Sequence, residues 1–491
     1  MAAVVRAVNV PTEIPAGFDV TPTGIYFTDS DPAKQLTTVP AWVVGVHRTL
    51  IGNHWSVEVA WKDHDGNIKT AIIAYADLLQ RSNILEELAQ DGLLFLPGAT
   101  NLFARYLALA VALPTTPRVR THRKLGFFTL ERDGQSDTLG FMLPYTCLLP
   151  MHEEPADAAE TEDTPPQADG ASKANQPQEE AIRFHPLLQS KTFEAYTPAG
   201  KLEDWQATIA PMAGNALIVF AVCAGFASPF LALAGLDNVI FHLFGNSSTG
   251  KTSALQAGVS PWGRGSDPQL SGQARSLIER WNSTSNAMEP MAATHSDLLL
   301  AIDELGSSGD ATVSVYNATS GRGKARMTDT GGMRDQHQWS LCILSSGEFS
   351  MQEKIEETTK RKAKTGEIIR ANDIPVAELA HDNTLSQDEE RQLIEALKRQ
   401  CSESYGTAGP AFIQIVLDHF RTEAPLREWL KGNIDTFHAE LVEAAEASGR
   451  HLGPAHVRAM RRFAFVSAVG CLASQTGVLP FSEDIVVLSI A

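Results

Sequence analysis

Val239-Ile-Phe-His-Leu-Phe244 runs directly into Gly245-Asn-Ser-Ser-Thr-Gly-Lys-Thr252, and a helical pattern follows from Ser253. The first segment predicts a buried strand, and the second matches GxxxxGK[ST], a phosphate-binding pattern that requires a strand before it and a helix after it. Glycines let such a loop wrap around a phosphate, while its N–H groups and the helix N-terminus attract negative charge. We therefore expect an α/β fold that binds ATP or GTP, in which Lys251 reaches the β- and γ-phosphates and Thr252 binds Mg²⁺. The expected nucleotide-binding residues of this loop are Gly245, Asn246, Ser247, Ser248, Thr249, Gly250, Lys251 and Thr252.

A second apolar run, Leu298–Ile302, ends in the adjacent acids Asp303 and Glu304. Five consecutive apolar residues predict a central strand of a parallel sheet. At its carboxyl end we expect Asp303 to hold Mg²⁺ through water and Glu304 to polarise the attacking water. A strand capped by two solvated acids is the alternative, but the preceding phosphate loop favours the metal site. Two adjacent acids indicate a hydrolase rather than a kinase.

A third apolar run, Trp339–Leu344, is followed by Ser345, Ser346, Gly347 and Glu348. In ATPases of the AAA+ type, such a strand lies between the two nucleotide-binding strands, and a polar side chain at its tip orients the lytic water. Either serine has the chemistry for this task, although Asn or Thr is the usual choice, and we assign it to Ser346. An uninvolved strand end is the alternative.

Between the second and third runs lies a basic insertion, with Lys324 and Arg326 before Gly331-Gly332 and Arg334 after it. Two short runs around Gly-Gly predict a β-hairpin. Contact with one strand of DNA requires positive charge more than readout of base edges. We therefore predict that the three basic residues bind phosphates of single-stranded DNA. A solvated surface hairpin is the alternative.

Further arginines follow in the chain. Arg370 precedes Ile374-Pro375, the last expected sheet strand, and we predict that it stabilises the γ-phosphate of a neighbouring subunit's ATP. Arg361, within a run of mixed charges, is a weaker candidate for the same task. Arg458 opens an apolar helix, and we predict that it reaches the nucleotide from a helical lid. A packing or surface role is the alternative for Arg458.

Composition limits the class of protein. The 491 residues are 43% hydrophobic and 20% charged, with a formal net charge of −18, which excludes a wholly basic nucleic-acid coat. Five scattered cysteines without CxxC argue against a disulfide framework or a structural zinc. With no signal peptide expected at 1–11, we predict a cytoplasmic protein. The apolar stretch Ala216–Leu236 is long enough to span a membrane, but Pro229 and its small residues favour a buried helical hairpin.

The chain divides by pattern into four parts. We predict an α+β domain at 1–148, an acidic disordered linker at 149–185, a parallel-sheet ATPase core at 186–378 and an all-helical lid at 379–491. The linker is assigned because it is acidic and almost lacks large apolar side chains. The first domain is expected to have strands at 41–46, 55–61, 68–74 and 127–130 and helices at 75–90 and 102–112. The lid is expected to have helices at 386–404, 411–423, 425–448 and 454–477.

Several quoted pieces carry a family resemblance: FHLFGNSSTGKTSAL, SPWG, WNSTSNAME, LLLAIDEL, GRGKAR and SSGE. They resemble the domain-of-unknown-function family 927, found in helicase-like proteins of phages, plasmids and integrative elements, and WSVEVAW resembles its front half. The resemblance implies a P-loop NTPase of the AAA+ type that forms rings. Ser346 departs from it, standing where the family usually has Thr. The chain also stops at Ala491, where more helix is expected, so a C-terminal DNA-binding piece is expected to be missing or supplied by another chain.

Together these features predict an ATP-hydrolysing helicase-like motor of a mobile element. It is expected to use ATP and Mg²⁺ and to act on DNA, single-stranded where it is bound, as a homo-oligomeric hexameric ring without a membrane span. An ATP-driven switch or defence NTPase without unwinding is the first alternative. A nucleic-acid-binding accessory with degenerate hydrolysis is the second.

Overall fold

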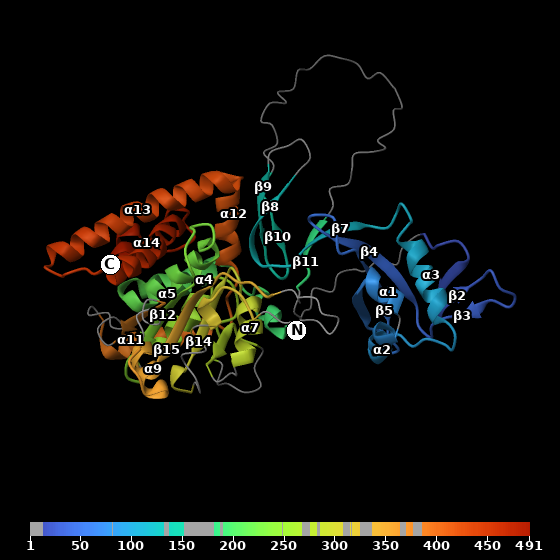
Figure 1. Cartoon of the computed structure of the whole chain (residues 1–491), viewed down its shortest axis with the longest axis horizontal. Helices are drawn as coiled ribbons and strands as arrows, with labels where there is room; N and C mark the ends of the chain where they lie inside the picture. Colours follow the sequence, from blue (N-terminus) through green and yellow to red (C-terminus); the bar gives the residue numbers. More distant parts are fainter. Residues whose placement is uncertain are drawn as a thin grey trace, which may run out of the picture. The chain divides into compact units, whose positions relative to one another are not determined.

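The computed structural model combines a β-rich N-terminal part, a five-stranded all-parallel sheet and a helical C-terminal region (Figure 1). Contacts group the chain into two compact units. The first unit comprises 1–123 and 157–185, and the second comprises 124–156 and 186–491. The structure describes residues 13–80, 82–131, 137–151, 181–186, 190–247, 249–267, 275–281, 285–307, 315, 317–324, 336–363, 370–376 and 385–491.

The parallel sheet has the strand order β13-β14-β15-β12-β16. Its strands are β12 (Val239–Phe244), β13 (Ile278–Arg280), β14 (Leu299–Asp303), β15 (Cys342–Gly347) and β16 (Ala371–Pro375). The three apolar runs found in the sequence are all strands, and β12, β14 and β15 are buried along nearly their whole length, as central parallel strands require. β15 lies between β12 and β14, as expected. Because every pair is parallel, the carboxyl ends of these strands meet at one edge.

Helices cover this sheet. They are α5 (Ala216–Ala227), α6 (Lys251–Val259), α7 (Ser285–Thr294) and α9 (Met351–Thr359), while α4 (Leu202–Ile209) contacts other helices. The stretch expected to form a buried helical hairpin is buried, but it contains one helix, α5, buried from Leu217 to Ala227, and a 3₁₀ turn at Ser228–Phe230 in place of a second helix. The Asn215 side chain begins α5 by accepting a 3.1 Å hydrogen bond from the Ile218 N–H. None of the described helices combines the length and apolar character that crossing a membrane requires.

The C-terminal region is helical, as predicted. It contains α11 (Gln387–Gln400), α12 (Ala408–Phe420), α13 (Glu423–Ala447), α14 (Pro454–Gln475) and α15 (Glu483–Ile490). Ser386 and Glu389 form a capping box that begins α11. α14 packs closely on α5, because a Cβ at Gly470 would lie 2.9 Å from the Cys223 sulfur.

The first unit is built on a five-stranded sheet of order β11-β7-β4-β5-β6. Its strands are β4 (Ala41–Thr49), β5 (Ser56–Lys62), β6 (Ile68–Ala74), β7 (Arg118–His122) and β11 (Ala181–Phe184). A small sheet of β1 (Phe18–Thr21), β2 (Gly24–Phe27) and β3 (Lys34–Gln35) and the helices α1 (Tyr75–Gln80), α2 (Ser82–Gln90) and α3 (Thr100–Ala110) complete it. Val57, Val59 and Trp61 point from β5 into its core, as their alternation predicts.

The structure divides the front of the chain differently from the sequence pattern. β8 (Gly126–Leu130), β9 (Thr138–Met142) and β10 (Cys147–Leu148) form an antiparallel sheet that belongs to the second unit, although 1–148 was expected to be one domain. The Leu139 N–H, for example, donates to the Arg421 carbonyl at 2.8 Å. β11, within the expected linker at 149–185, pairs with β7. The remainder of that linker, 152–180, lies outside the described residues.

Candidate nucleotide-binding site

The loop after β12 has the backbone that a phosphate site requires. Gly245 and Gly250 adopt φ values of 150° and 83°, which other residues resist, and a Cβ at Gly245 would lie 3.1 Å from the Val376 side chain. Lys251 begins α6 immediately after Gly250. The N-terminus of this helix therefore points its free N–H groups toward the loop. Ser248, one of the predicted binding residues, lies outside the described part of the chain.

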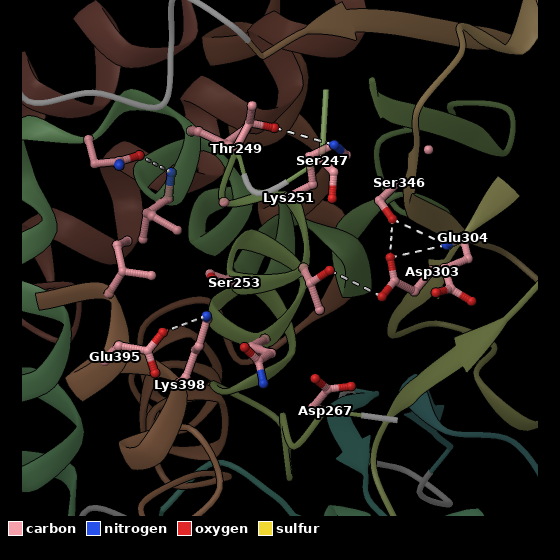
Figure 2. A pocket seen from close by; sticks show the side chains of 18 of the residues that line it. Ser247, Thr249, Lys251, Ser253, Asp267, Asp303, Glu304, Ser346, Glu395 and Lys398 are labelled. Atoms are coloured by element: carbon pink, nitrogen blue, oxygen red, sulfur yellow. Dashed lines mark hydrogen bonds and ion pairs between the residues drawn. The ribbon is translucent and has the colours of Figure 1, made fainter. Parts of the chain in front are cut away.

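The Lys251 ammonium lies in the mouth of this loop (Figure 2). Its Nζ donates to the Gly245 carbonyl at 2.8 Å, the Asn246 carbonyl at 2.6 Å and the Thr249 hydroxyl at 3.3 Å. Burial lowers the pKa of Lys251, while the carboxylates of Glu348 and Asp303 act in the opposite direction. The lysine thus presents its charge where phosphate oxygens can replace the loop carbonyls as partners.

Three side chains and one backbone N–H, from three elements, converge beside the loop. The Thr252 hydroxyl donates to Asp303 Oδ2 at 3.2 Å, and the Ser346 hydroxyl donates to Asp303 Oδ1. The Glu304 N–H lies 3.1 Å from Asp303 Oδ1 and 3.4 Å from Ser346 Oγ (Figure 2). Asp303 is only 4% exposed, so its carboxylate is held by this set of donors. The sequence placed Asp303, Glu304 and Ser346 at strand ends and Thr252 at the end of the phosphate-binding pattern.

Glu304 has an unusual backbone. Its φ is 62°, in the left-handed region that residues other than glycine rarely adopt. Backbone strain of this kind concentrates at functional sites, where the surrounding structure maintains it. Here the hydrogen bonds from the Glu304 N–H to Asp303 and Ser346 fix the turn at the end of β14.

The two serines at the end of β15 have different surroundings. Ser345 is fully buried, accepts a 2.8 Å hydrogen bond from the Trp281 indole N–H and donates to His242 Nδ1 at 2.9 Å. His242 Nε2 in turn donates to the Phe349 carbonyl at 2.9 Å. Burial lowers the pKa of His242, which keeps the ring neutral, as this pattern of donors and acceptors requires. Only Ser346 therefore faces the candidate site.

A cavity of about 890 Å³ joins these groups. Its lining includes the loop, the ends of β14 and β15, the start of α5 and one side of α11. The volume is within the range of pockets that enclose small organic ligands. The residues that line it from α11 are Glu390, Arg391, Ile394, Glu395 and Lys398. None of these five residues is predicted from the sequence, because an amphipathic helix rich in charge does not reveal which charges face a ligand.

The donor set beside the loop fits Mg²⁺. Mg²⁺ prefers oxygen ligands and is commonly bound by one or two protein oxygens together with substrate phosphates and water. Thr252 and Asp303 supply a hydroxyl and a carboxylate next to the phosphate loop. Among the described residues, no group of three or more His, Cys, Asp or Glu side chains could hold a metal ion by itself. A metal here would therefore share its ligands with the nucleotide.

The predicted arginines lie elsewhere. Arg370 precedes β16, and its carbonyl accepts from the Ile240 N–H at 3.2 Å, near the amino ends of the strands. Arg458 is exposed, and its Nε lies 3.3 Å from the Pro454 carbonyl. Burial lowers the pKa of Arg462, and the charges of Arg458 and Arg370 lower it further. The structure thus gathers these arginines near one another, and neither Arg370 nor Arg458 lines the cavity.

The base of the predicted basic hairpin is antiparallel. Arg322 bridges Gln338, and the Gly323 N–H donates to the His337 carbonyl at 2.8 Å. Lys324 is exposed, and its backbone N–H donates to Glu289 Oε1 at 3.2 Å. Arg326 and Arg334 lie outside the described residues.

Comparisons with known proteins agree with this architecture. The sequence profile of the family described as "Domain of unknown function (DUF927)" matches residues 18–134 and 171–338. The fold is similar to that of a solved structure described as "SCCmec type IV Cch - active helicase", with a TM-score of 0.63 and 17% identity over 97% of this chain and 76% of that chain. The C-terminal region of NrS-1 matches with a TM-score of 0.26 and 10% identity over 89% and 88% of the two chains, which is too weak to indicate a shared fold. No curated protein sequence matches the chain.

Proposed function

The chain belongs to the DUF927 family, and on that premise we propose that it is an ATP-hydrolysing, helicase-like motor of a mobile genetic element. The observation that carries the proposal is the convergence of Lys251, Thr252, Asp303, Glu304 and Ser346 around one cavity. These residues supply a phosphate-binding cation, two metal-binding oxygens, a carboxylate for water and a polar group beside it. The helicase activity described for the similar Cch structure supports the proposal.

Each residue has a chemical task in this proposal. Lys251 would exchange the loop carbonyls for the β- and γ-phosphate oxygens, while Thr252 and Asp303 would hold Mg²⁺. The bound metal would neutralise charge on the phosphates. Glu304 accepts a hydrogen bond from the attacking water and orients it. Ser346 fixes the Asp303 carboxylate and the Glu304 backbone, so it positions both acids.

The arrangement of strands supports an AAA+-type core at 186–378 with a helical lid at 379–491. β15 lies between β12 and β14, which places its polar tip between the phosphate loop and the acidic strand. α11 contributes its charged side to the cavity from the region proposed as the lid. Movement of α11 would therefore change the environment of the nucleotide.

The position of Arg370 favours action on a neighbouring subunit. It lies near the amino ends of the strands, whereas the phosphate loop follows their carboxyl ends, so it is far from the nucleotide of its own chain. In a homo-oligomeric ring, proposed to be hexameric, Arg370 would meet the γ-phosphate bound by the next copy. The exposed Lys324, with Arg326 and Arg334, would bind single-stranded DNA in the ring.

Hydrolysis with and without single-stranded DNA tests the proposal, with strand displacement on a forked duplex as the second assay. Lys251→Ala is expected to abolish nucleotide binding. Glu304→Gln is expected to keep binding and to lower turnover by about 10²- to 10⁴-fold, because it removes the group that acts on water. Turnover of Glu304→Gln at the wild-type rate would contradict the assignment. Hydrolysis without strand displacement would instead favour an ATP-driven switch.

A further inference from the structure

The five-stranded sheet of the first unit carries a row of arginine and aromatic side chains. In the register of β4 and β7, Arg48 is opposite Arg120. β4 and β5 are antiparallel, and His47 is paired with Ser56. The next residues toward the turn, Arg48 and Trp55, are therefore opposite each other. The Tyr75 N–H donates to the Trp55 carbonyl at 3.0 Å, which continues the row onto the end of β6. Side chains at paired positions lie on the same face of a sheet, so the four residues share one face.

Contacts within this row are those of a flat aromatic surface beside a cation. The Arg48 guanidinium lies 5.6 Å from the Trp55 ring centre. The Trp55 and Tyr75 rings are 6.4 Å apart with an angle of 26° between their planes. The Trp55 indole N–H donates to the Gly52 carbonyl at 3.1 Å, which fixes the ring in the β4–β5 turn. The rings are therefore held in one orientation before any ligand arrives.

The row lies where the core ends. Two residues back along each strand, Val46, Val57 and Ile73 are fully buried on the same face. Trp55 is 37% exposed, and Ile51, at the tip of the same turn, is 81% exposed. Part of the Trp55 ring is therefore open to solvent, where a nucleobase can stack on it.

The segment beside this row is basic. Arg118, Arg120, His122 and Arg123 lie within six residues that include no acid, in a chain whose formal charge is −18. Burial raises the pKa of Tyr75, and the charge of the exposed Arg118 acts in the opposite direction. Positive charge thus lies close to the exposed rings.

We propose that this platform, formed by Arg48, Trp55, Tyr75, Arg118 and Arg120, binds single-stranded DNA. A base stacks on the exposed Trp55 ring, and the arginines contact the phosphates on either side of it. Single strands are favoured over duplex because a paired base has no free face to offer to a ring. Charge complementarity favours a polyanion over an apolar peptide or a second, acidic copy of the chain. The proposal goes beyond the motor function, since the platform lies in the other unit and requires neither nucleotide nor the basic hairpin.

Fluorescence anisotropy of the full chain without nucleotide tests the platform, using labelled oligothymidylate and an abasic strand of equal length. Trp55→Ala is expected to weaken oligothymidylate binding by about tenfold. The same change should leave binding of the abasic strand nearly unaltered, because only stacking is lost. Trp55→Phe keeps a ring and should retain most of the affinity. This rescue, with thermal unfolding of each variant, separates loss of stacking from loss of folding.

The contribution of the arginines to DNA binding is tested with substitutions on the same sheet. Arg118→Ala is expected to lower the salt dependence of single-strand binding by roughly 0.7 in log–log slope for one lost phosphate contact. Lys69→Ala is the matched control, because Lys69 is opposite Trp61 at the far end of β6 from Tyr75. It should leave the slope unchanged.

Three results would overturn the proposal. The first is that Trp55→Ala weakens binding of the oligothymidylate and of the abasic strand equally. The second is that every platform variant binds DNA with the wild-type affinity. The third is that the variants bind DNA normally but differ from wild type in self-association, measured by light scattering. The last result would assign the surface to a second copy of the chain. ATP hydrolysis without DNA should be the same in Trp55→Ala as in wild type. If the wild type itself does not hydrolyse ATP, the motor function fails, but the binding measurement still decides the platform.

Discussion

Replacing each of two neighbouring serines by alanine should give opposite results. Ser345 and Ser346 are adjacent at the end of β15, and both are buried. Each substitution removes one hydroxyl group. Ser346 contacts Asp303 and the Glu304 N–H, whereas Ser345 contacts Trp281 and His242. One variant should therefore lose turnover and the other stability.

For Ser346→Ala, the lost interaction is a hydrogen bond to a buried carboxylate. Hydrogen bonds to charged groups contribute about 1.5–3 kcal/mol. If most of this falls on the transition state, turnover decreases by about 10- to 150-fold, since each 1.36 kcal/mol is a factor of ten. ATP affinity should change less, because Lys251 and the loop remain. Ser346→Thr keeps the hydroxyl and should restore most of the activity.

For Ser345→Ala, the cost falls on folding. The variant leaves the Trp281 N–H without an acceptor and His242 Nδ1 without a donor, both in the buried interior. An unsatisfied buried polar group costs about 1–3 kcal/mol, so the free energy of unfolding should decrease by about 2–6 kcal/mol. The hydroxyl does not reach the cavity, so turnover per folded molecule should be close to that of wild type.

Turnover at saturating ATP and unfolding in urea, measured on both variants, distinguish these outcomes. The expected pattern is low turnover with normal stability for Ser346→Ala, and the reverse for Ser345→Ala. If Ser345→Ala lost turnover at normal stability while Ser346→Ala remained active, the assignment of the serines would be reversed. Equal effects of both changes on turnover would show that the end of β15 acts as a unit, contrary to the reasoning above.

Other residues yield three further predictions. Arg370→Ala should keep ATP binding and lose hydrolysis, and mixing it with Lys251→Ala subunits should restore some activity if the arginine acts on a neighbour; inactive mixtures with intact oligomers would contradict this. The double change Lys324→Ala and Arg326→Ala should spare basal hydrolysis and remove its stimulation by single-stranded DNA, measured with a coupled ATPase assay at several salt concentrations. Burial raises the pKa of Asp297 to about 6 from 3.8, so its contribution to stability is present below pH 3.8 and lost as pH rises through 6. Asp297→Asn, which suits the left-handed φ of 62°, should therefore raise the urea midpoint at pH 8 and not at pH 4.

The centre of the candidate site could be predicted because its signals are local. A strand, a glycine loop and a helix are consecutive in the chain, and the acids and serines directly follow apolar runs. Parallel strands bring such ends to one edge, so separate segments such as Thr252, Asp303 and Ser346 could be expected to meet. The strand pattern offered Ser345 and Ser346 equally, so the assignment to Ser346 had no local signal behind it, since the surroundings of each serine depend on which face of the strand its side chain takes.

Distant parts of the cavity could not be predicted. Arg458 was expected to reach the nucleotide from the helical region, but α11 supplies the lining instead, with Arg391 and Lys398 among its residues. α11 is amphipathic, and α14, which contains Arg458, is largely apolar, but both carry basic residues. Only the packing of the folded chain decides which of them lines the cavity. The same limit affected the domain boundary, because nothing local in β8–β10 shows that this sheet pairs with α12 and the turn at Arg421 rather than with the strands before it.

The position of basic segments could not be predicted from the composition of the chain. A net charge of −18 excludes a uniformly basic protein, yet it does not show where single basic segments lie. In the sequence, Arg48, Trp55 and Arg120 are separated by a turn, two strands and helices, and none of them forms a motif. Register alone brings them into one row, because β4 pairs with β5 on one side and with β7 on the other. A basic and aromatic surface can therefore arise in an acidic chain from strand order, and the single-strand binding experiment tests a property of the fold rather than of any one segment.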